Sequence, residues 1–124
     1  YQANRTDRLR RGEDGWRESF GGEDNLVVWK VDADTGEPEA IQRVDVPSIH
    51  VRTLSIHPGG DLLAAATIRP VPVREPNGDL RLVPAAILLY RIGADGRLEP
   101  LRKYDVDTEG KAMWWSGFVE VPAA

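Results

Sequence analysis

Residues 20–46, FGGEDNLVVWKVDADTGEPEAIQRVDV, hold two β-strand patterns on either side of a tight turn. Along 27–31, Val, Trp and Val alternate with Val and Lys, which is the period-two pattern of a strand rich in β-forming residues. Asp-Thr-Gly at 34–36 then turns the chain, because Gly adopts positive φ without steric cost. The alternation resumes along 40–46. This stretch therefore predicts a β-hairpin.

The same hairpin pattern returns near the end of the chain as ILLYRIGADGRLEPLRKYDVD, residues 87–107. Residues 29–31 correspond to 90–92, and residues 43–45 correspond to 103–105. Repeats of four strands are typical of β-propellers, whose blades take about 40–45 residues each. We therefore predict an all-β fold with about two four-stranded antiparallel blades of a larger ring, the second one lengthened by an insertion.

Further strand patterns complete this count. We expect strands at residues 25–32, 40–46, 50–57, 62–68, 86–92, 98–106 and 112–121, and the end of another strand at 1–5. The domain then divides into an incomplete blade with a charged loop at 1–48, a complete blade at 49–108 and a ring-closing strand at 109–124. Because propellers close with about four to eight blades, the other blades would come from further sequence or from partner chains. A free-standing sandwich of about eight strands is the competing architecture, and the internal repeat disfavours it.

An insertion at residues 69–85, RPVPVREPNGDLRLVPA, interrupts the second repeat. The Asn-Gly pair at 77–78 predicts a two-residue hairpin turn with positive φ at both positions. Such a turn places the valines of 71–73 opposite the leucines of 80–82, in a protruding β-arm whose prolines discourage pairing with other strands. The earlier segment 5–22, RTDRLRRGEDGWRESFGG, is expected to be a charged loop, because its glycines disfavour a helix.

Composition narrows the class of protein. The net charge of −4 argues against a nucleic-acid partner, which needs a dominant basic surface, and no apolar run reaches the roughly 18 residues of a membrane span, so no membrane partner is expected. The absence of Cys excludes thiolate chemistry and fits a reducing compartment such as the cytoplasm, although Cys-free periplasmic proteins are also common. No signal peptide is visible, and an opening on Tyr1 rather than Met suggests that the true N-terminus lies elsewhere.

Two acidic clusters, at residues 13–14 and 23–25, offer oxygen ligands of the kind that Ca²⁺ binds. Their spacing is not that of an EF-hand, and solvated acidic loops account for them. Zinc-type His and Cys spacing and a Gly-rich phosphate loop are both missing from the sequence. We therefore expect no metal and no other cofactor.

Five segments carry a resemblance to a known family: YQANR at 1–5, FGGEDNLVVWKVDADTGEP at 20–38, IHVRTLSIHPGGDLLAAA at 49–66, LLYRIGADGRLE at 88–99 and MWWSGFVEVP at 113–122. With these segments the chain resembles the C-terminal third of the seven-bladed lactonase-type propellers, the group of 6-phosphogluconolactonase-like and carboxymuconate-cyclase-like proteins. Two departures from that pattern stand out, since Val51 replaces a usual Pro and His57 replaces a usual Asp. The first relaxes the loop that would aim the side chains on either side of it.

The resemblance implies a lactonase that hydrolyses a small anionic lactone, of the sugar or muconate type, without a metal. Opening a lactone needs a base for water, a donor or cation for the developing oxyanion, and a group that holds the anionic tail of the substrate. His50 and Glu23 are the candidate catalytic bases, and Arg52 and Arg5 are the candidate substrate-binding residues. The structural alternatives are a turn histidine bonded to backbone, a loop-capping Glu23, and arginines paired with carboxylates such as Asp45.

A non-catalytic binding propeller is the second functional hypothesis. In that case the arm at 69–85 contacts a protein or ligand partner through its strand edge or its prolines. A third hypothesis is that the chain associates with copies of itself to complete the ring.

Trp114 and Trp115 are adjacent and would point to opposite faces of the expected strand, so that at least one packs between blades. His57, in a Pro-Gly turn, is expected to face solvent.

Overall fold

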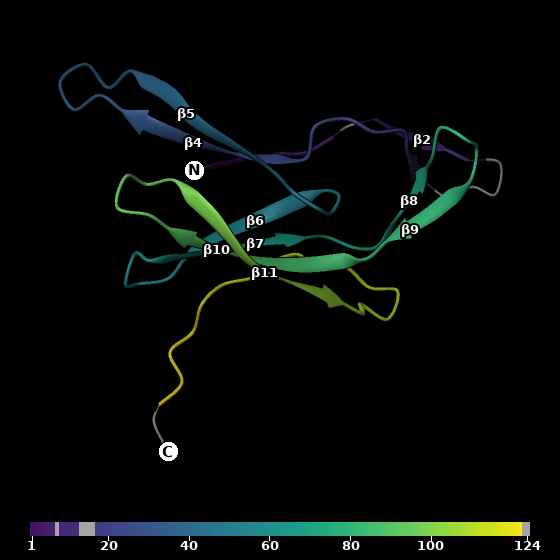
Figure 1. The fold of residues 1–124 in the computed structure, drawn as a ribbon. Coiled ribbons are helices and arrows are strands. Elements are labelled where there is room, and N and C mark those ends of the chain that lie inside the picture. Colours follow the sequence, from purple (N-terminus) through teal and green to yellow (C-terminus); the bar gives the residue numbers. More distant parts are fainter. Residues whose placement is uncertain (7, 13–16, 123–124) are drawn as a thin grey trace.

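The computed structural model describes residues 1–6, 8–12 and 17–122, which form strands and turns without a helix. The strands of this described part belong to three separate sheets (Figure 1). The predicted all-β class is therefore confirmed, although the sheets of the described residues do not close into a ring. No helix capable of crossing a membrane is found among the described residues.

The first sheet has the order β1-β4-β5, from β1 (Gln2–Asn4), β4 (Asn25–Val31) and β5 (Pro38–Asp45). Both pairings are antiparallel, as the repeated hairpin pattern predicted. Asp32 fixes the turn between β4 and β5, because its Oδ1 accepts hydrogen bonds from the backbone N–H of Asp34 at 3.0 Å and of Thr35 at 2.8 Å. Gly36 closes the turn with a φ of 75°, in the region that favours glycine.

The second sheet has the order β11-β10-β7-β6, from β6 (Val51–Ile56), β7 (Leu62–Thr67), β10 (Ala85–Ile92) and β11 (Leu98–Val106). All three pairings are antiparallel. The four strands match the four expected for the complete blade, apart from one or two residues at their ends. The insertion leaves this sheet after β7 and returns to it at β10.

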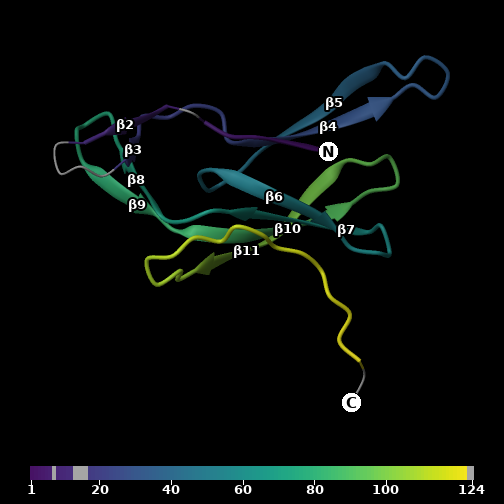
Figure 2. The same ribbon diagram turned by 180° about the vertical axis from the view of Figure 1, so that it is seen from behind.

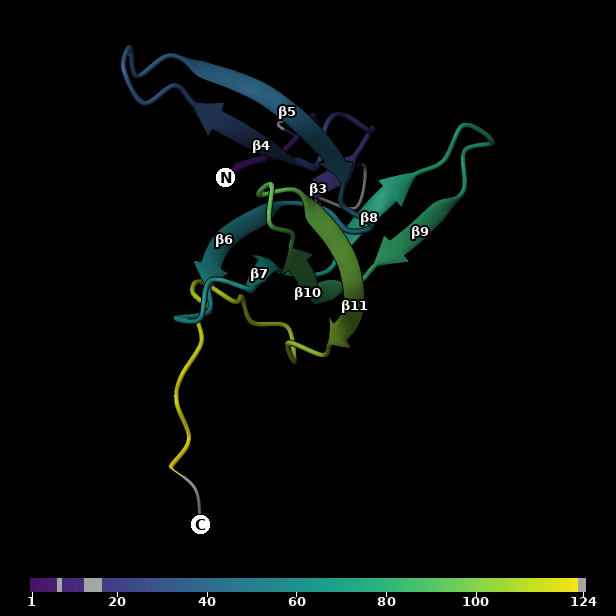
Figure 3. The same ribbon diagram turned by 60° about the vertical axis from the view of Figure 1, so that its left-hand side comes forward.

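One apolar core joins the first two sheets, and the β4–β5 hairpin lies across the second sheet (Figure 3). The core contains the buried side chains of Leu26, Val28, Val44, Val46, Val51, Leu63, Ala65, Ala86, Leu88, Tyr90 and Leu98. At its edge, the Gln42 amide donates to the Leu98 carbonyl at 2.9 Å, and its Oε1 accepts from the Leu98 N–H at 2.7 Å. These two bonds satisfy both the N–H and the carbonyl of Leu98, and they fix the hairpin over the sheet.

The third sheet comes from two segments that are far apart in the sequence. Its order is β2-β3-β8-β9, from β2 (Leu9–Arg11), β3 (Arg17–Ser19), β8 (Val71–Arg74) and β9 (Leu80–Val83). The irregular loop expected at 5–22 is therefore wrong for the parts that form β2 and β3. The arm expected at 69–85 is present but is not isolated, since β8 pairs in parallel with β3 at Ser19 and Val73.

The turn of the arm differs from the prediction, and the strand register differs with it. The Glu75 N–H donates to the Asp79 carbonyl at 2.9 Å and encloses a three-residue Pro-Asn-Gly loop. Within that loop only Gly78 has a positive φ, 92°, which is the geometry of a turn followed by a left-handed Gly. As a result Val71 lies opposite Val83 and not opposite a leucine, so the expected pairing of valines with leucines is wrong.

Residues 111–122 form no strand, so the strand expected at 112–121 is absent. The segment instead contacts β6 through side chains. Its chain then leaves the second sheet (Figure 2). The Arg52 guanidinium lies 5.0 Å from the Trp114 ring, and the hydroxyls of Thr53 and Ser116 are hydrogen-bonded at 2.7 Å. Within the described residues its only backbone hydrogen bond to another part of the chain is that from the Met113 N–H to the Ile68 carbonyl, at 2.7 Å, and a strand needs a continuous ladder of such bonds.

A buried ion pair joins the two halves of the third sheet. The Glu18 carboxylate on β3 is only 3% exposed, and Arg74 on β8 donates to both of its oxygens at 2.7 to 3.0 Å. The Arg74 guanidinium also donates to the Gly78 carbonyl at 2.7 Å, which ties the pair to the arm's turn. Because β3 and β8 share a single strand pairing, this bidentate contact is the main polar link between them.

We expect Arg74→Met to lower the free energy of unfolding by about 3 kcal/mol or more, because it leaves the buried Glu18 carboxylate without a counter-charge. Arg81→Met on the same hairpin is the matched control, since its pair with Glu75 is largely exposed and should cost less than about 1 kcal/mol. Urea denaturation of both variants measures the difference. Equal losses in the two variants would contradict the role given to the buried pair.

Candidate functional site

His50 is held in an unusual backbone conformation immediately before β6. Its φ is 64°, one of two positive values among the described non-glycine residues. The His50 N–H donates to Asp24 Oδ1 at 2.8 Å, and the ring Nε2 lies 2.9 Å from the Thr6 carbonyl oxygen. A carbonyl can only accept, so Nε2 carries the proton and Nδ1 is the accepting nitrogen of the neutral ring. The chain thus fixes the tautomer of His50 as well as its position.

Asp24 connects the segments that surround His50. Its Oδ1 also accepts from the Thr6 N–H at 3.4 Å, so one carboxylate oxygen holds two chain segments. Burial raises the pKa of Asp24 above the usual 3.8, and the hydrogen bonds from His50 and Thr6 oppose that rise only in part. Gly22 stands against Thr6 so closely that a Cβ there would lie 2.0 Å from the Thr6 hydroxyl, which requires glycine at this position.

His50 lines a cleft of about 240 Å³ where the insertions meet the blade. The lining residues are Leu9, Arg17, His50, Arg69, Pro70, Val71 and Pro72. Two of them, Arg17 and Arg69, carry guanidinium groups, and no described carboxylate lies within 4.0 Å of either one. An imidazole with a fixed tautomer therefore shares a small cleft with two positive charges, which is an arrangement suited to an anion.

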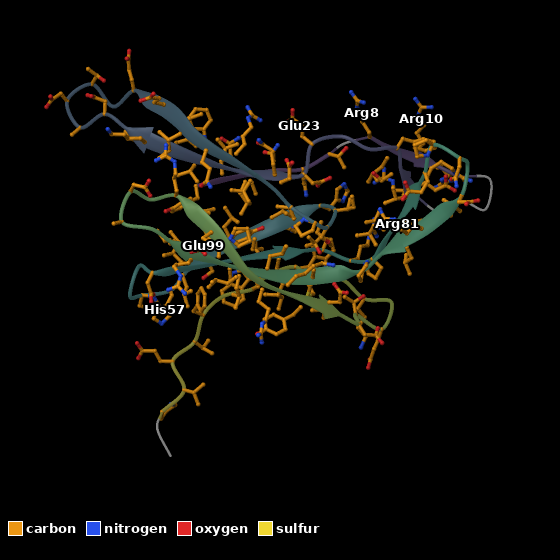
Figure 4. The ribbon with its side chains drawn as sticks, in the orientation of Figure 1. Arg8, Arg10, Glu23, His57, Arg81 and Glu99 are labelled. Atoms are coloured by element: carbon orange, nitrogen blue, oxygen red, sulfur yellow. The ribbon has the colours of Figure 1, made fainter. Side chains whose placement is uncertain are left out.

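Glu23 does not share this cleft. Its carboxylate Oε2 accepts from Arg43 at 3.2 Å and from the Asn25 amide at 3.3 Å. Glu23 lines a separate opening of about 500 Å³ beside Arg43 and Asp45, and Figure 4 shows its side chain directed away from the body of the protein. The structure thus places Glu23 in an exposed ion pair and does not bring it together with His50.

The two predicted anion-binding arginines also lie outside the cleft. Arg52 is exposed and stacks on Trp114 rather than on a carboxylate such as Asp45. Arg5 is exposed in the segment after β1, next to Thr6. The Nδ1 of His57 is hydrogen-bonded to Asp61 Oδ1 at 3.1 Å in a partly exposed turn. Figure 4 places His57 at the end of the second sheet, away from Glu23.

Arg17 and Arg69 are the residues that sequence reasoning missed. Each belongs to a segment outside the repeat, so no spacing within the repeat pointed to it. Arg69 stands directly before the first proline of the insertion, and Arg17 opens β3. The pairing of β3 with β8 brings them to one cleft, and a pairing between distant short strands has no local sequence signal.

The comparisons with known proteins returned no match to a protein-family model, to a curated protein or to a solved structure. The resemblance to the lactonase-type propellers therefore stays a prediction from the sequence motifs. Among the described residues, no group of three or more His, Cys, Asp or Glu side chains is arranged to hold a metal ion.

We expect Asp24→Asn to be at least as stable as the parent near neutral pH, because the amide keeps the Oδ1 acceptor and removes a partly buried charge. A folded pKa above 3.8 means that the folded state binds the proton more tightly, so the favourable contribution is present below the unfolded pKa and is lost as pH rises through the folded one. The stability advantage of the variant should therefore grow from about pH 4 upward, as measured by urea denaturation.

The exposed turn residue Asp34 provides the control, and Asp34→Asn should show no such growth between the same pH values. An Asp24→Asn variant that is less stable than the parent at every pH would mean that the charge itself holds His50 and Thr6.

Proposed function

We propose that the protein binds a small anionic lactone at the His50 cleft and hydrolyses it without a metal. The single observation that supports this proposal is the sharing of one cleft by the fixed imidazole of His50 and the guanidinium groups of Arg17 and Arg69. The motif resemblance to lactonase-type propellers points to the same reaction class. In this assignment Arg17 and Arg69 take the anion-binding role predicted for Arg5 and Arg52.

The chemistry follows from the tautomer of His50. Nδ1 accepts a proton from water while the water oxygen bonds to the lactone carbonyl carbon. When the ring C–O bond breaks, the leaving oxygen takes the proton back from Nδ1, and the product is a hydroxy acid. The Thr6 carbonyl accepts a hydrogen bond from Nε2–H throughout and stabilises the charged imidazole. One guanidinium binds the anionic tail of the substrate, and the other is available to the oxyanion.

His50→Asn should lower kcat for lactone hydrolysis by about 10²- to 10⁴-fold, because it removes the base while Asn tolerates the positive φ. Arg69→Gln should raise KM by about tenfold through the loss of one charged hydrogen bond. His57→Asn and Arg97→Gln are matched controls at turns outside the cleft and should leave both constants unchanged. Turnover of sugar and muconate-type lactones by the purified protein is the measurement.

Unchanged turnover in His50→Asn would remove His50 from catalysis. A lactone that binds, and whose affinity depends on Arg69, without being hydrolysed would instead favour the non-catalytic binding module.

We also propose that the first two sheets are neighbouring blades of a larger propeller, completed by further sequence or by partner chains. The C-terminal segment supports this proposal, because its contacts follow β6 in the same direction: Arg52 meets Trp114, Thr53 meets Ser116 and His57 meets Phe118. Innermost strands of adjacent propeller blades run side by side in this way. The same segment exposes Trp115, Val119 and Val121, each by more than three quarters.

If a further blade covers this segment, Trp115 is buried in the assembled protein. The part of the tryptophan fluorescence that disappears in Trp115→Phe should then be blue-shifted and protected from quenching by iodide, as expected of an indole in an apolar contact. Trp29→Phe is the comparison, because Trp29 is partly exposed and its indole N–H already donates to Gln2 at 3.0 Å. Full quenching of the Trp115 emission by iodide would show an open surface and contradict the ring.

A further inference from the structure

A second, larger cleft lies on the other side of the segment that carries Arg69. It has a volume of about 430 Å³, within the usual range for small-molecule sites. The lining residues are Glu18, Arg69, Pro70, Pro72, Leu80, Leu82, Gly110 and Lys111. Three parts of the chain supply them: β3, the β8–β9 insertion and the turn after β11. We call this cleft the leucine groove.

The floor of the groove is apolar and open to solvent. Leu80 and Leu82 are 47% and 65% exposed, although both stand on a paired strand. They alternate with Arg81, whose charge pairs with Glu75 at 2.7 Å, so the leucines share one face of the arm and the ion pair belongs to the other. Pro72 lies directly opposite Leu82 across the ladder and extends the apolar surface.

The charges at the groove are positive and uncompensated. Glu18 lines the groove, but Arg74 already bonds both of its carboxylate oxygens. No described carboxylate lies within 4.0 Å of Arg69 or Lys111. These two cations are therefore available to an anion, on a chain whose net charge is −4.

We propose that the leucine groove binds a small amphipathic carboxylate, with an unbranched or aromatic apolar body and a single acid group. Burying such a body on the leucines and prolines is favourable, because it removes apolar surface of both from water. The carboxylate then meets Lys111 or Arg69, which gives the groove its preference for anions over neutral molecules of the same shape. The groove shares Arg69, Pro70 and Pro72 with the His50 cleft, but Lys111 and both leucines lie outside that cleft, so variants at these three positions test the groove apart from lactone hydrolysis.

Calorimetric titration with octanoate tests the proposal. The neutral probe of equal chain length is 1-octanol, and acetate is the carboxylate probe that lacks a long apolar chain. Octanoate should bind saturably, about three- to tenfold more tightly than octanol, and acetate should not bind measurably. Lys111→Gln should abolish most of the preference for octanoate over octanol. Leu82→Gln should lower the affinity for octanoate and for octanol about threefold or more, as expected when an apolar contact surface is lost.

Two matched controls should bind octanoate like the parent: Lys30→Gln and Leu101→Gln, both exposed strand residues outside the groove. His50→Asn should also bind octanoate normally, so a failed lactonase assay leaves this result unaffected. Equal affinity for octanoate and octanol would overturn the proposal, as would octanoate affinity that Lys111→Gln and Leu82→Gln do not change. Absence of saturable octanoate binding up to about 10 mM would overturn it as well.

Discussion

The bidentate ion pair between Glu18 and Arg74 is the contact on which both clefts depend. It is buried on the Glu18 side, and it links two hairpins whose strands otherwise share a single parallel pairing. Without it, β2–β3 and β8–β9 would be two short ribbons, and an isolated ribbon is marginally stable in water. Arg17 stands next to Glu18 on β3, while Arg69 and Pro70 lead into β8, which begins with Val71 and Pro72. The ion pair between β3 and β8 therefore sets the separation of the walls of the His50 cleft.

A second polar junction places His50 against those walls. Asp24 lies just before β4 of the first sheet, and His50 lies just before β6 of the second, so their hydrogen bond joins the two sheets at one end. The carboxylate accepts two backbone N–H groups at the cost of partial burial, which is why the pKa of Asp24 is raised. The positive φ of His50 and the small size of Gly22 both follow from this close approach.

Most of the regular structure could be predicted because it rests on local signals. The β4–β5 hairpin follows from alternation and an Asp-Thr-Gly turn, and the strands of the second sheet follow from apolar runs between Pro and Gly residues. The prediction failed where a partner decides the conformation. Residues 112–121 have a strand-like sequence but join no sheet of the described residues, with one backbone hydrogen bond from Met113 to Ile68. The strands β2 and β3 form in a Gly-rich segment, where they pair with each other and β3 also pairs with β8.

The all-β class, the repeated hairpin and the position of the insertion could be predicted from the amino-acid sequence, because each of these depends on residues close together in the chain. The sequence also offered His50 as a candidate residue. The charges around His50, in contrast, come from distant segments that meet only in the folded chain. Arg17 and Arg69 line the same cleft as His50. In contrast, Glu23 pairs with Arg43, Arg52 stacks on Trp114, and Arg5 is exposed to solvent. The register of the arm was also settled in three dimensions, since one extra loop residue shifts every pair of the ladder.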